Sequence, residues 1–417
     1  MRGLGIKALI ILILILAIKT GSASAGIYSC TICHSNINSQ YSKSVHSEIG
    51  TTCTECHGGD PSDLTFSAMS RAKGYKGKIS RASIPLLCAK CHSDVKMMLQ
   101  YREYVDEYAI YRDSEHGKKL RQGDYKVAVC TDCHNTHDIK KASDPNSPAY
   151  KLNVPKTCAR CHSDKKYMEQ YKIPTNQFEK YKESVHGRHV LEQGDMRAPA
   201  CPDCHGTHGA TPPGVKDIHN VCGRCHSVQR ENLLRSPHFE AMKNKKIKEC
   251  AVCHGSHGVQ EATIALFTSE KAENGGKGCL GCHKASSVEY GVALELVKTI
   301  KEADDAVNIA TRLTQKAREK GFDTDEEMNK INIAKTILLE IGPVTHSLSP
   351  DIVKENAENV IINAVDVQDM VKAKLVEWRD RRVTLVINIL VFLIVIVLLA
   401  VKRRRMMKNG SKDMDKQ

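Results

Sequence analysis

All 18 cysteines of this 417-residue sequence belong to one motif, Cys-x-x-Cys-His, which occurs nine times. A disulfide framework is the usual explanation for many cysteines in an exported chain, but it requires neither this fixed spacing nor a histidine after each pair. A zinc ribbon uses two Cys-x-x-Cys knuckles for each ion, and nine is an odd number. A thioredoxin-like redox pair occurs once in a chain. The motif therefore excludes these three kinds of site.

Cys-x-x-Cys-His is the attachment signature of c-type haem. Positions i, i+3 and i+4 share one face of a helix, so the two thiols can bond the two vinyl groups of one porphyrin while the histidine reaches its iron. We therefore predict nine covalently bound haem c groups. The attaching cysteines are Cys30, Cys33, Cys53, Cys56, Cys88, Cys91, Cys130, Cys133, Cys158, Cys161, Cys201, Cys204, Cys222, Cys225, Cys250, Cys253, Cys279 and Cys282. The proximal iron ligands are His34, His57, His92, His134, His162, His205, His226, His254 and His283.

Histidines outside the motifs reveal an internal repeat of two motifs. The first motif of each pair is followed by Ser-x-His, and these histidines are His46, His116, His186 and His238. The second motif of three pairs continues to another histidine three residues later, and these are His137, His208 and His257. The first pair instead reads His57-Gly58-Gly59-Asp60. A nine-haem domain over residues 26–283 is expected, with two-haem units near residues 30–60, 88–138, 158–209 and 222–258 and a ninth haem at 279–283.

This arrangement resembles the multihaem c-type cytochromes of respiratory bacteria and archaea. The resemblance rests on the nine motifs, on Ser-x-His-Gly at His116-Gly117 and His186-Gly187, and on the Cys-x-x-Cys-His-Gly-Thr-His-Gly sequence from Cys201 to Gly209. In those proteins the Ser-x-His and Thr-His histidines serve as distal iron ligands, often to a haem other than the nearest one in sequence. The resemblance implies this role for His46, His116, His137, His186, His208, His238 and His257.

Three further histidines are less patterned. His346 lies between two expected helices, and the resemblance allows it to return to the last haem as a distal ligand. For His189 and His219 the sequence leaves two roles open, an iron ligand and an ordinary surface histidine. We expect nine bis-histidine irons, with the ninth distal ligand taken from His189 or His219. The first unit is the weak point, because a histidine must arrive from elsewhere or else His34 or His57 belongs to a five-coordinate haem.

The fold is expected to be mainly α with much irregular loop. Aromatic residues make up only 5% of the chain, so the haems themselves must supply most of the core of the haem domain. Longer helices are expected from Lys96 to Arg112 and from Lys165 to Glu183, with an interruption at Pro174.

A helical bundle or stalk is expected over residues 284–382. Apolar residues there recur at helical spacing in three stripes. The first is Val292, Leu296, Ala303, Val307 and Ala310, ended by Gly321. The second is Met328, Ile331, Leu338 and Ile341, ended by Gly342-Pro343. The third follows Ser349-Pro350 and is Val353, Ala357, Val360, Ala364, Val367, Val371 and Trp378. The third stripe fits packing against the other two helices, and a coiled-coil oligomer through the stalk is also open.

Both ends of the chain carry targeting signals. Residues 1–25 combine basic residues, a short apolar run and Ala23-Ser24-Ala25, which predicts a signal peptide. The apolar run 383–401 is long enough to span a bilayer, and the basic residues that begin the 402–417 tail predict a cytoplasmic tail with the haem domain on the periplasmic side. The formal net charge is +13, but no basic block lies outside the tail, so no nucleic-acid partner is expected.

Three functions compete. The first is a membrane-anchored electron carrier between a quinol-oxidising or b-type cytochrome subunit and other periplasmic or extracellular cytochromes. The second is a reductase of a small oxyanion such as nitrite or tetrathionate, or of hydroxylamine. The third is a filament, against which the membrane anchor argues. Catalysis requires an open iron position. Ten histidines outside the motifs against nine irons force no such position, so we expect an electron carrier without catalytic residues.

Overall fold

The computed structural model describes residues 29–210, 221–245, 247–272 and 275–414. It is 66% helical, and the described residues form no strand beyond an isolated bridge between Lys271 and Lys277. The predicted mainly α fold is therefore confirmed. The chain divides into two compact units, Met1–Ile218 with His257–Val259, and His219–Ser256 with Gln260–Gln417.

Short helices carry the nine motifs. They are α2 (Ser29–Cys33), α5 (Cys53–His57), α6 (Ile84–His92), α10 (Cys130–His134), α11 (Val154–His162), α15 (Cys201–His205), η6 (Cys222–Arg224), α18 (Ala251–His254) and η7 (Cys279–Gly281). Six of these helices contain both cysteines of their motif, whereas η6 and η7 contain only the first cysteine and α18 only the second. In these three motifs the backbone N–H of the histidine still donates to the carbonyl of the first cysteine, as in a helical turn.

Pairs of helices that meet at a serine carry the Ser-x-His sequences. The helices before the serine are α3 (Ser35–Tyr41), α8 (Glu107–Asp113), α13 (Gln177–Glu183) and α16 (Ser227–Arg235). Those after it are α4 (Val45–Glu48), α9 (Glu115–Arg121), α14 (Val185–Leu191) and α17 (Pro237–Asn244). The remaining short helices are η1 (Phe66–Met69), η2 (Arg71–Lys73), η3 (Arg81–Ser83), α7 (Val95–Leu99), α12 (Lys165–Met168), η4 (Glu169–Tyr171) and α19 (Ala265–Thr268).

The two expected longer helices are each divided, which corrects the sequence prediction. Residues 100–106 separate α7 from α8, and Arg102 has a φ of 58°, which an α-helix does not allow. The second region is broken before Pro174 as well as at it, since Lys172 also has a positive φ. The helical pattern did not reveal the first break, because no glycine or proline marks it.

Apolar side chains of the first unit form only a small core. Its cluster of buried hydrophobic residues contains Leu120, Val127 and Val129. Among the residues of this unit that the structure describes, side chains alone do not form a continuous interior. That porphyrins supply most of the core stays a prediction.

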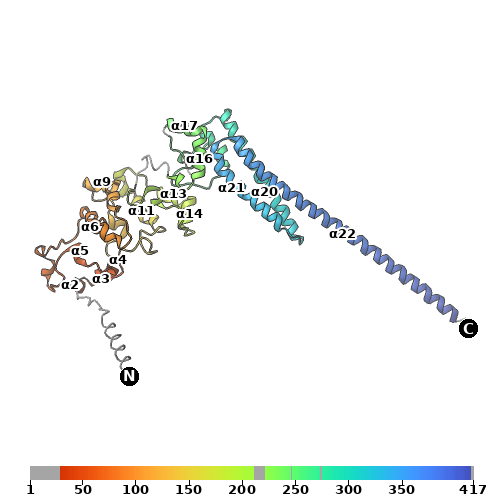
Figure 1. The fold of residues 1–417 in the computed structure, drawn as a ribbon, viewed down its shortest axis with the longest axis horizontal. Coiled ribbons are helices and arrows are strands. Elements are labelled where there is room, and N and C mark those ends of the chain that lie inside the picture. The colour runs from red at the N-terminus through yellow and green to blue at the C-terminus, as the bar shows by residue number, and fades with distance from the viewer. Residues whose placement is uncertain (1–28, 211–220, 246, 273–274, 415–417) are drawn as a thin grey trace, which may run out of the picture. The chain divides into compact units, whose positions relative to one another are not determined.

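Three long helices, α20 (Val288–Glu319), α21 (Asp325–Val344) and α22 (Pro350–Met414), form a bundle in the second unit, with η8 (Thr345–Ser347) in the last turn (Figure 1). Most residues of the three expected stripes are buried there, including every member of the third from Val353 to Val371. Two details differ. Helix α21 continues through Pro343 to Val344, and Trp378 packs between the cations of Lys320 and Arg382 rather than in the core.

Helix α22 runs without a break from the bundle into the apolar segment. It is the one helix among the described residues that is long and apolar enough to cross a membrane. The predicted signal peptide, residues 1–25, lies outside the described residues.

Candidate haem-binding site

A carboxylate fixes the start of three of the motif helices. Glu55, Asp132 and Asp203 each lie inside a Cys-x-x-Cys pair. Each accepts a hydrogen bond of 2.7 Å from the backbone N–H three residues earlier, at Thr52, Val129 and Ala200. This satisfies a donor that a helix terminus otherwise leaves unpaired. The repeated position of these acids inside the motif is a sequence signal that could have identified them.

Four pairs of imidazoles in the first unit join a motif histidine to a histidine from another motif pair. His46 faces His92 and His116 faces His162, with ring centres 6.0 and 6.1 Å apart. His137 faces His57 and His208 faces His134, at 6.3 Å in both cases. A fifth pair, His257 with His205, has its ring centres 5.9 Å apart. These five predicted distal histidines therefore lie opposite motif histidines that are distant in sequence.

The second unit contains two more pairs. His238 faces His283 at 5.8 Å, and His346 faces His254 at 6.1 Å. His346 was expected at the last motif, but the structure places it at the eighth. The reason is that His238 already occupies the position opposite His283, while α16 lies against η8 and brings the turn that contains His346 to His254.

The ring spacings fit a haem iron between each pair. A metal–imidazole bond is about 2 Å long and the bonding nitrogen lies about 1 Å from its ring centre, so two imidazoles on one metal have centres about 6 Å apart. Two rings also carry the second hydrogen bond that orients a metal-binding histidine. His57 Nδ1 donates to the carbonyl of Gly77 at 3.0 Å, and His346 Nδ1 donates to that of Gly342 at 3.1 Å. Both leave Nε2 for the metal.

Electrostatics keep these imidazoles in the neutral form that binds a metal. Burial lowers the pKa of His46, His116, His134 and His254 below the ordinary value, and the facing histidine lowers each pKa further. Burial and the facing imidazole therefore both favour the neutral form of these four histidines.

A tyrosine and a glycine explain the Ser-x-His-Gly sequence. Ser114 Oγ donates to the carbonyl of Tyr111 at 2.6 Å and accepts from the N–H of Gly117 at 3.1 Å. Ser184, Tyr181 and Gly187 repeat this arrangement. A Cβ on Gly117 would lie 2.1 Å from the carbonyl oxygen of Tyr111, so only glycine allows the two helices to approach this closely.

The tyrosines also reach the motif helices. Tyr41, Tyr111 and Tyr181 each stand three residues before the serine, and each hydroxyl donates to a carbonyl two residues before the second motif of the pair, at Thr51, Ala128 and Pro199. Burial raises the pKa of Tyr41 to about 12, so its hydroxyl remains a donor. The repeated Tyr-x-x-Ser-x-His sequence could have revealed this role.

Cysteines of consecutive motifs are neighbours in space. Within the first unit, neighbouring cysteines connect the motifs in order, through Cys30 with Cys53, Cys56 with Cys91, Cys88 with Cys130, Cys133 with Cys158, and Cys158 with Cys201. Within the second unit, Cys222 neighbours Cys250 and Cys253 neighbours Cys279. The attachment points therefore form a continuous series in each unit.

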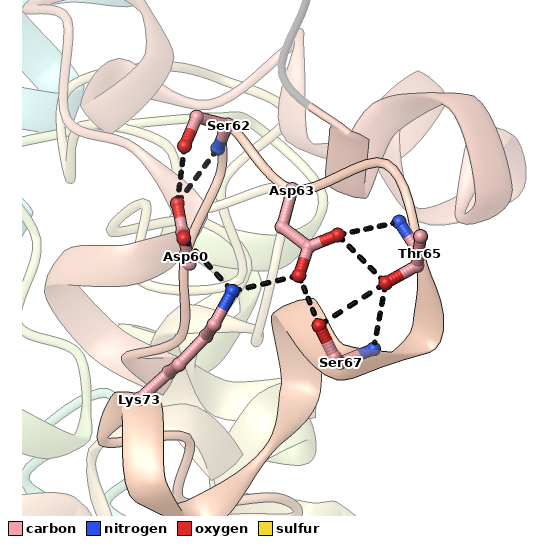
Figure 2. A network of polar contacts seen from close by, with 6 residues as sticks. All are labelled: Asp60, Ser62, Asp63, Thr65, Ser67 and Lys73. Carbon is pink, nitrogen blue, oxygen red and sulfur yellow. Dashed lines mark hydrogen bonds and ion pairs between the residues drawn. The ribbon is translucent and has the colours of Figure 1, made fainter.

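In the first pair of motifs, a loop stands where the other pairs carry the second histidine. Gly58 and Gly59 have positive φ values, and a Cβ on Gly58 would lie 2.0 Å from the carbonyl oxygen of Gly74. Lys73 joins Asp60 at 3.0 Å and Asp63 at 2.7 Å, and Ser62, Thr65 and Ser67 complete the network (Figure 2). The backbone N–H of Ser29 donates to the carbonyl of Pro61, so the loop contacts the start of the first motif helix.

Some predicted ligands are not among the seven pairs. His34 is exposed, and no imidazole of the described residues faces it. His186 and His226 make interactions of their own. His189 lies 3.8 Å from Asp195, and His219 lies outside the described residues.

Comparisons with known proteins indicate the same class of cofactor. The family described as Doubled CXXCH motif matches residues 121–167. Multiheme cytochrome MtrA of Shewanella baltica is 23% identical over 305 residues, which is 62% of this chain and 77% of that protein. Cytochrome c-type protein NapC of Haemophilus influenzae is 27% identical over 148 residues, 32% of this chain and 66% of that protein. These findings support a multihaem c-type cytochrome with covalently bound haem c. No solved structure gives a significant match.

Proposed function

We propose that the chain is a membrane-anchored nonahaem c-type cytochrome that transfers electrons. A quinol-oxidising or b-type cytochrome membrane subunit is the proposed donor, and periplasmic or extracellular cytochromes are the acceptors. The observation that carries this function is the series of neighbouring motifs whose histidines face a second imidazole. An iron held on both sides by imidazole has no position for a substrate, and it exchanges electrons without chemistry on a ligand.

The proposed haem ligands follow from the motifs and the pairs. Each Cys-x-x-Cys-His motif attaches one haem c and supplies its proximal histidine. His46, His116, His137, His186, His208, His238, His257 and His346 are the proposed distal ligands. Bis-histidine ligation keeps reduction potentials low, because it is a methionine ligand that raises them. Donors and acceptors of low potential therefore fit this protein.

The haem count is tested by the intact mass of the denatured mature protein. Nine haem increments are expected, and eight in the variant with Cys279→Ser and Cys282→Ser. A wild-type chain that carries fewer than nine after proper maturation would contradict the count. A redox titration of the same sample should show several overlapping one-electron steps, as a chain of neighbouring haems requires.

The proposed topology places the haem domain in the periplasm and residues 402–417 in the cytoplasm. Basic residues flank the apolar segment on both sides, but two of the three nearest before it are paired with acids, and the third, Arg382, lies over the ring of Trp378. Arg379 joins Asp380 and Arg381 joins Glu377, whereas Lys402 begins a cluster without an acidic neighbour in sequence. Protease added to spheroplasts should remove the haem domain and spare a tag at Gln417. Removal of the tag instead would reverse the topology.

Reduction of nitrite, hydroxylamine or tetrathionate is the second candidate. Exposed His34, which no described imidazole faces, is the observation that favours it. Turnover of one of these substrates by the reduced protein would support this function.

A further inference from the structure

The seven imidazole pairs follow one rule along the chain. A histidine from an earlier Ser-x-His faces the first motif of a later pair, as His46 faces His92 and His116 faces His162. A histidine from later in the chain faces the second motif of an earlier pair, as His137 faces His57. Partners of first motifs thus come from earlier in the sequence, and partners of second motifs come from later.

The first motif pair departs from the repeat at this position. In the other pairs, the second histidine faces the second motif of the preceding pair. In the first pair, the loop held by Lys73, Asp60 and Asp63 stands where that histidine would be (Figure 2).

No imidazole of the described residues faces His34. Seven of the ten histidines outside the motifs already face other motif histidines. Of the other three, His186 makes interactions of its own, His189 lies beside Asp195, and His219 lies outside the described residues. His34 is also exposed, whereas the seven paired motif histidines are all half-buried.

We infer that the haem attached at Cys30 and Cys33 has an exchangeable axial position opposite His34, where small neutral ligands of ferrous iron, such as carbon monoxide and nitric oxide, bind. This inference rests on the proposed haem attachment. The axial position accepts the lone pair of the incoming ligand, and no bond in the protein needs to break. Cys30 lies against Cys53, so this iron adjoins the second haem and can be reduced through the series.

Carbon monoxide is the probe for this site. The full-length holoprotein in detergent is reduced with dithionite and titrated with carbon monoxide, and the change in the Soret band is compared with the haem content. One carbon monoxide is expected for each nine haems. The oxidised protein should also show one high-spin ferric iron among nine by paramagnetic resonance, a readout that requires no turnover.

One variant and one control locate the site. Cys30→Ser with Cys33→Ser removes the first haem and should abolish carbon monoxide binding, and its intact mass must show eight haems. Gly291 lies inside α20, where an added Cβ would meet no heavy atom within 4 Å, and Gly291→Ala should leave nine haems and the carbon monoxide binding unchanged.

The outcomes separate this inference from the proposed function. A wild-type protein with nine haems that binds no carbon monoxide and is entirely low-spin would overturn the inference and leave the electron carrier intact. Binding that persists without the first haem would also overturn it. If the first variant does not accumulate, His46→Ala offers a second test. It should raise the number of bound carbon monoxide molecules from one to two, and a rise from zero to one would refute the inference. A haem count below nine in the wild type would instead contradict the proposed function.

Discussion

Replacing Gly117 by alanine should displace His116, a proposed distal ligand, without changing any proposed haem-binding residue. The new Cβ would lie 2.1 Å from the carbonyl oxygen of Tyr111 and 2.8 Å from the Cα of Arg112, whereas ordinary contacts are 3.4 Å or longer. Both obstacles are backbone atoms, so α9 must retreat from α8 by about 1 Å. His116 precedes Gly117 and moves with it. Overpacking of this kind costs about 1–3 kcal/mol.

The displacement is large compared with the bond that it affects. A metal–imidazole bond of about 2 Å does not tolerate a shift of about 1 Å, so the iron opposite His162 should become partly high-spin. For a unit of this size the melting temperature should fall by about 2–4 °C for each kcal/mol. Paramagnetic resonance and thermal unfolding followed by circular dichroism measure the two effects on the same sample.

Gly291→Ala is the matched control. Gly291 lies inside α20, and no heavy atom lies within 4 Å of the position that a Cβ would take there. Alanine should therefore leave every spin state unchanged and stabilise the helix by up to about 1 kcal/mol. If Gly117→Ala melts at the wild-type temperature and stays entirely low-spin, the close approach of α8 and α9 does not hold the ligand, and the reasoning fails.

Three other substitutions each test the contacts of one side chain. His346→Ala should make the iron of the eighth motif, at His254, high-spin, and should add one carbon monoxide site in the reduced protein. Arg81→Met should lower the melting temperature by a few degrees, since the Arg81 guanidinium contacts Asp132 at 2.6 Å and two backbone carbonyls, and hydrogen bonds to charged groups contribute about 1.5–3 kcal/mol when not fully exposed. Lys73→Met removes the two ion pairs that hold the loop of the first motif pair, so this loop should become more mobile. Hydrogen bonds from Ser62 and Lys73 lower the pKa of Asp60 to about 2, so the network contributes stability above the ordinary carboxyl pKa and loses it as the pH falls toward 2. Limited proteolysis at neutral pH should cleave the variant loop faster.

Each of these variants has a control. Removal of the eighth haem through Cys250→Ser and Cys253→Ser should cancel the effect of His346→Ala, and an effect that survives would place His346 at another iron. Arg112→Met removes an exposed pair with Asp113 and should not change the melting temperature. Lys78 is exposed and lies outside the network of Figure 2, so Lys78→Met should leave the rate of proteolysis unchanged.

The spacing of residues in the sequence was sufficient to predict local helices. It was insufficient to predict which histidines face one another in the fold. The nine motifs define one helical turn each, and the apolar stripes of the stalk follow from helical periodicity, as burial from Val353 to Val371 confirms. Which imidazole faces which motif is a property of the tertiary fold. His57 and His137 are far apart in sequence, and no local pattern specifies that they meet.

The same limit applied to His346. Its place between two helices was predictable, but its target depended on the contact between α16 and η8, which joins segments far apart in the chain. Arg102 shows a different limit. Its positive φ divides a region with good helical composition, and no glycine or proline signals this in the sequence.

The length of the stalk constrains the path of the electrons. Helix α22 rises about 1.5 Å per residue, so the part between Pro350 and Arg382 extends about 50 Å before the apolar segment begins. A tilt of about 20°, which is average for membrane helices, shortens the height only slightly. Lys320, at the turn between α20 and α21, contacts Trp378 near the apolar segment, whereas His346 lies at the opposite end of the bundle and faces His254. With the apolar segment in a bilayer, as proposed, the eighth motif would lie far from the membrane surface, out of direct reach of a quinol in the membrane. A donor at this end of the series must itself extend along the stalk, and this is why we propose a separate membrane subunit that oxidises the quinol.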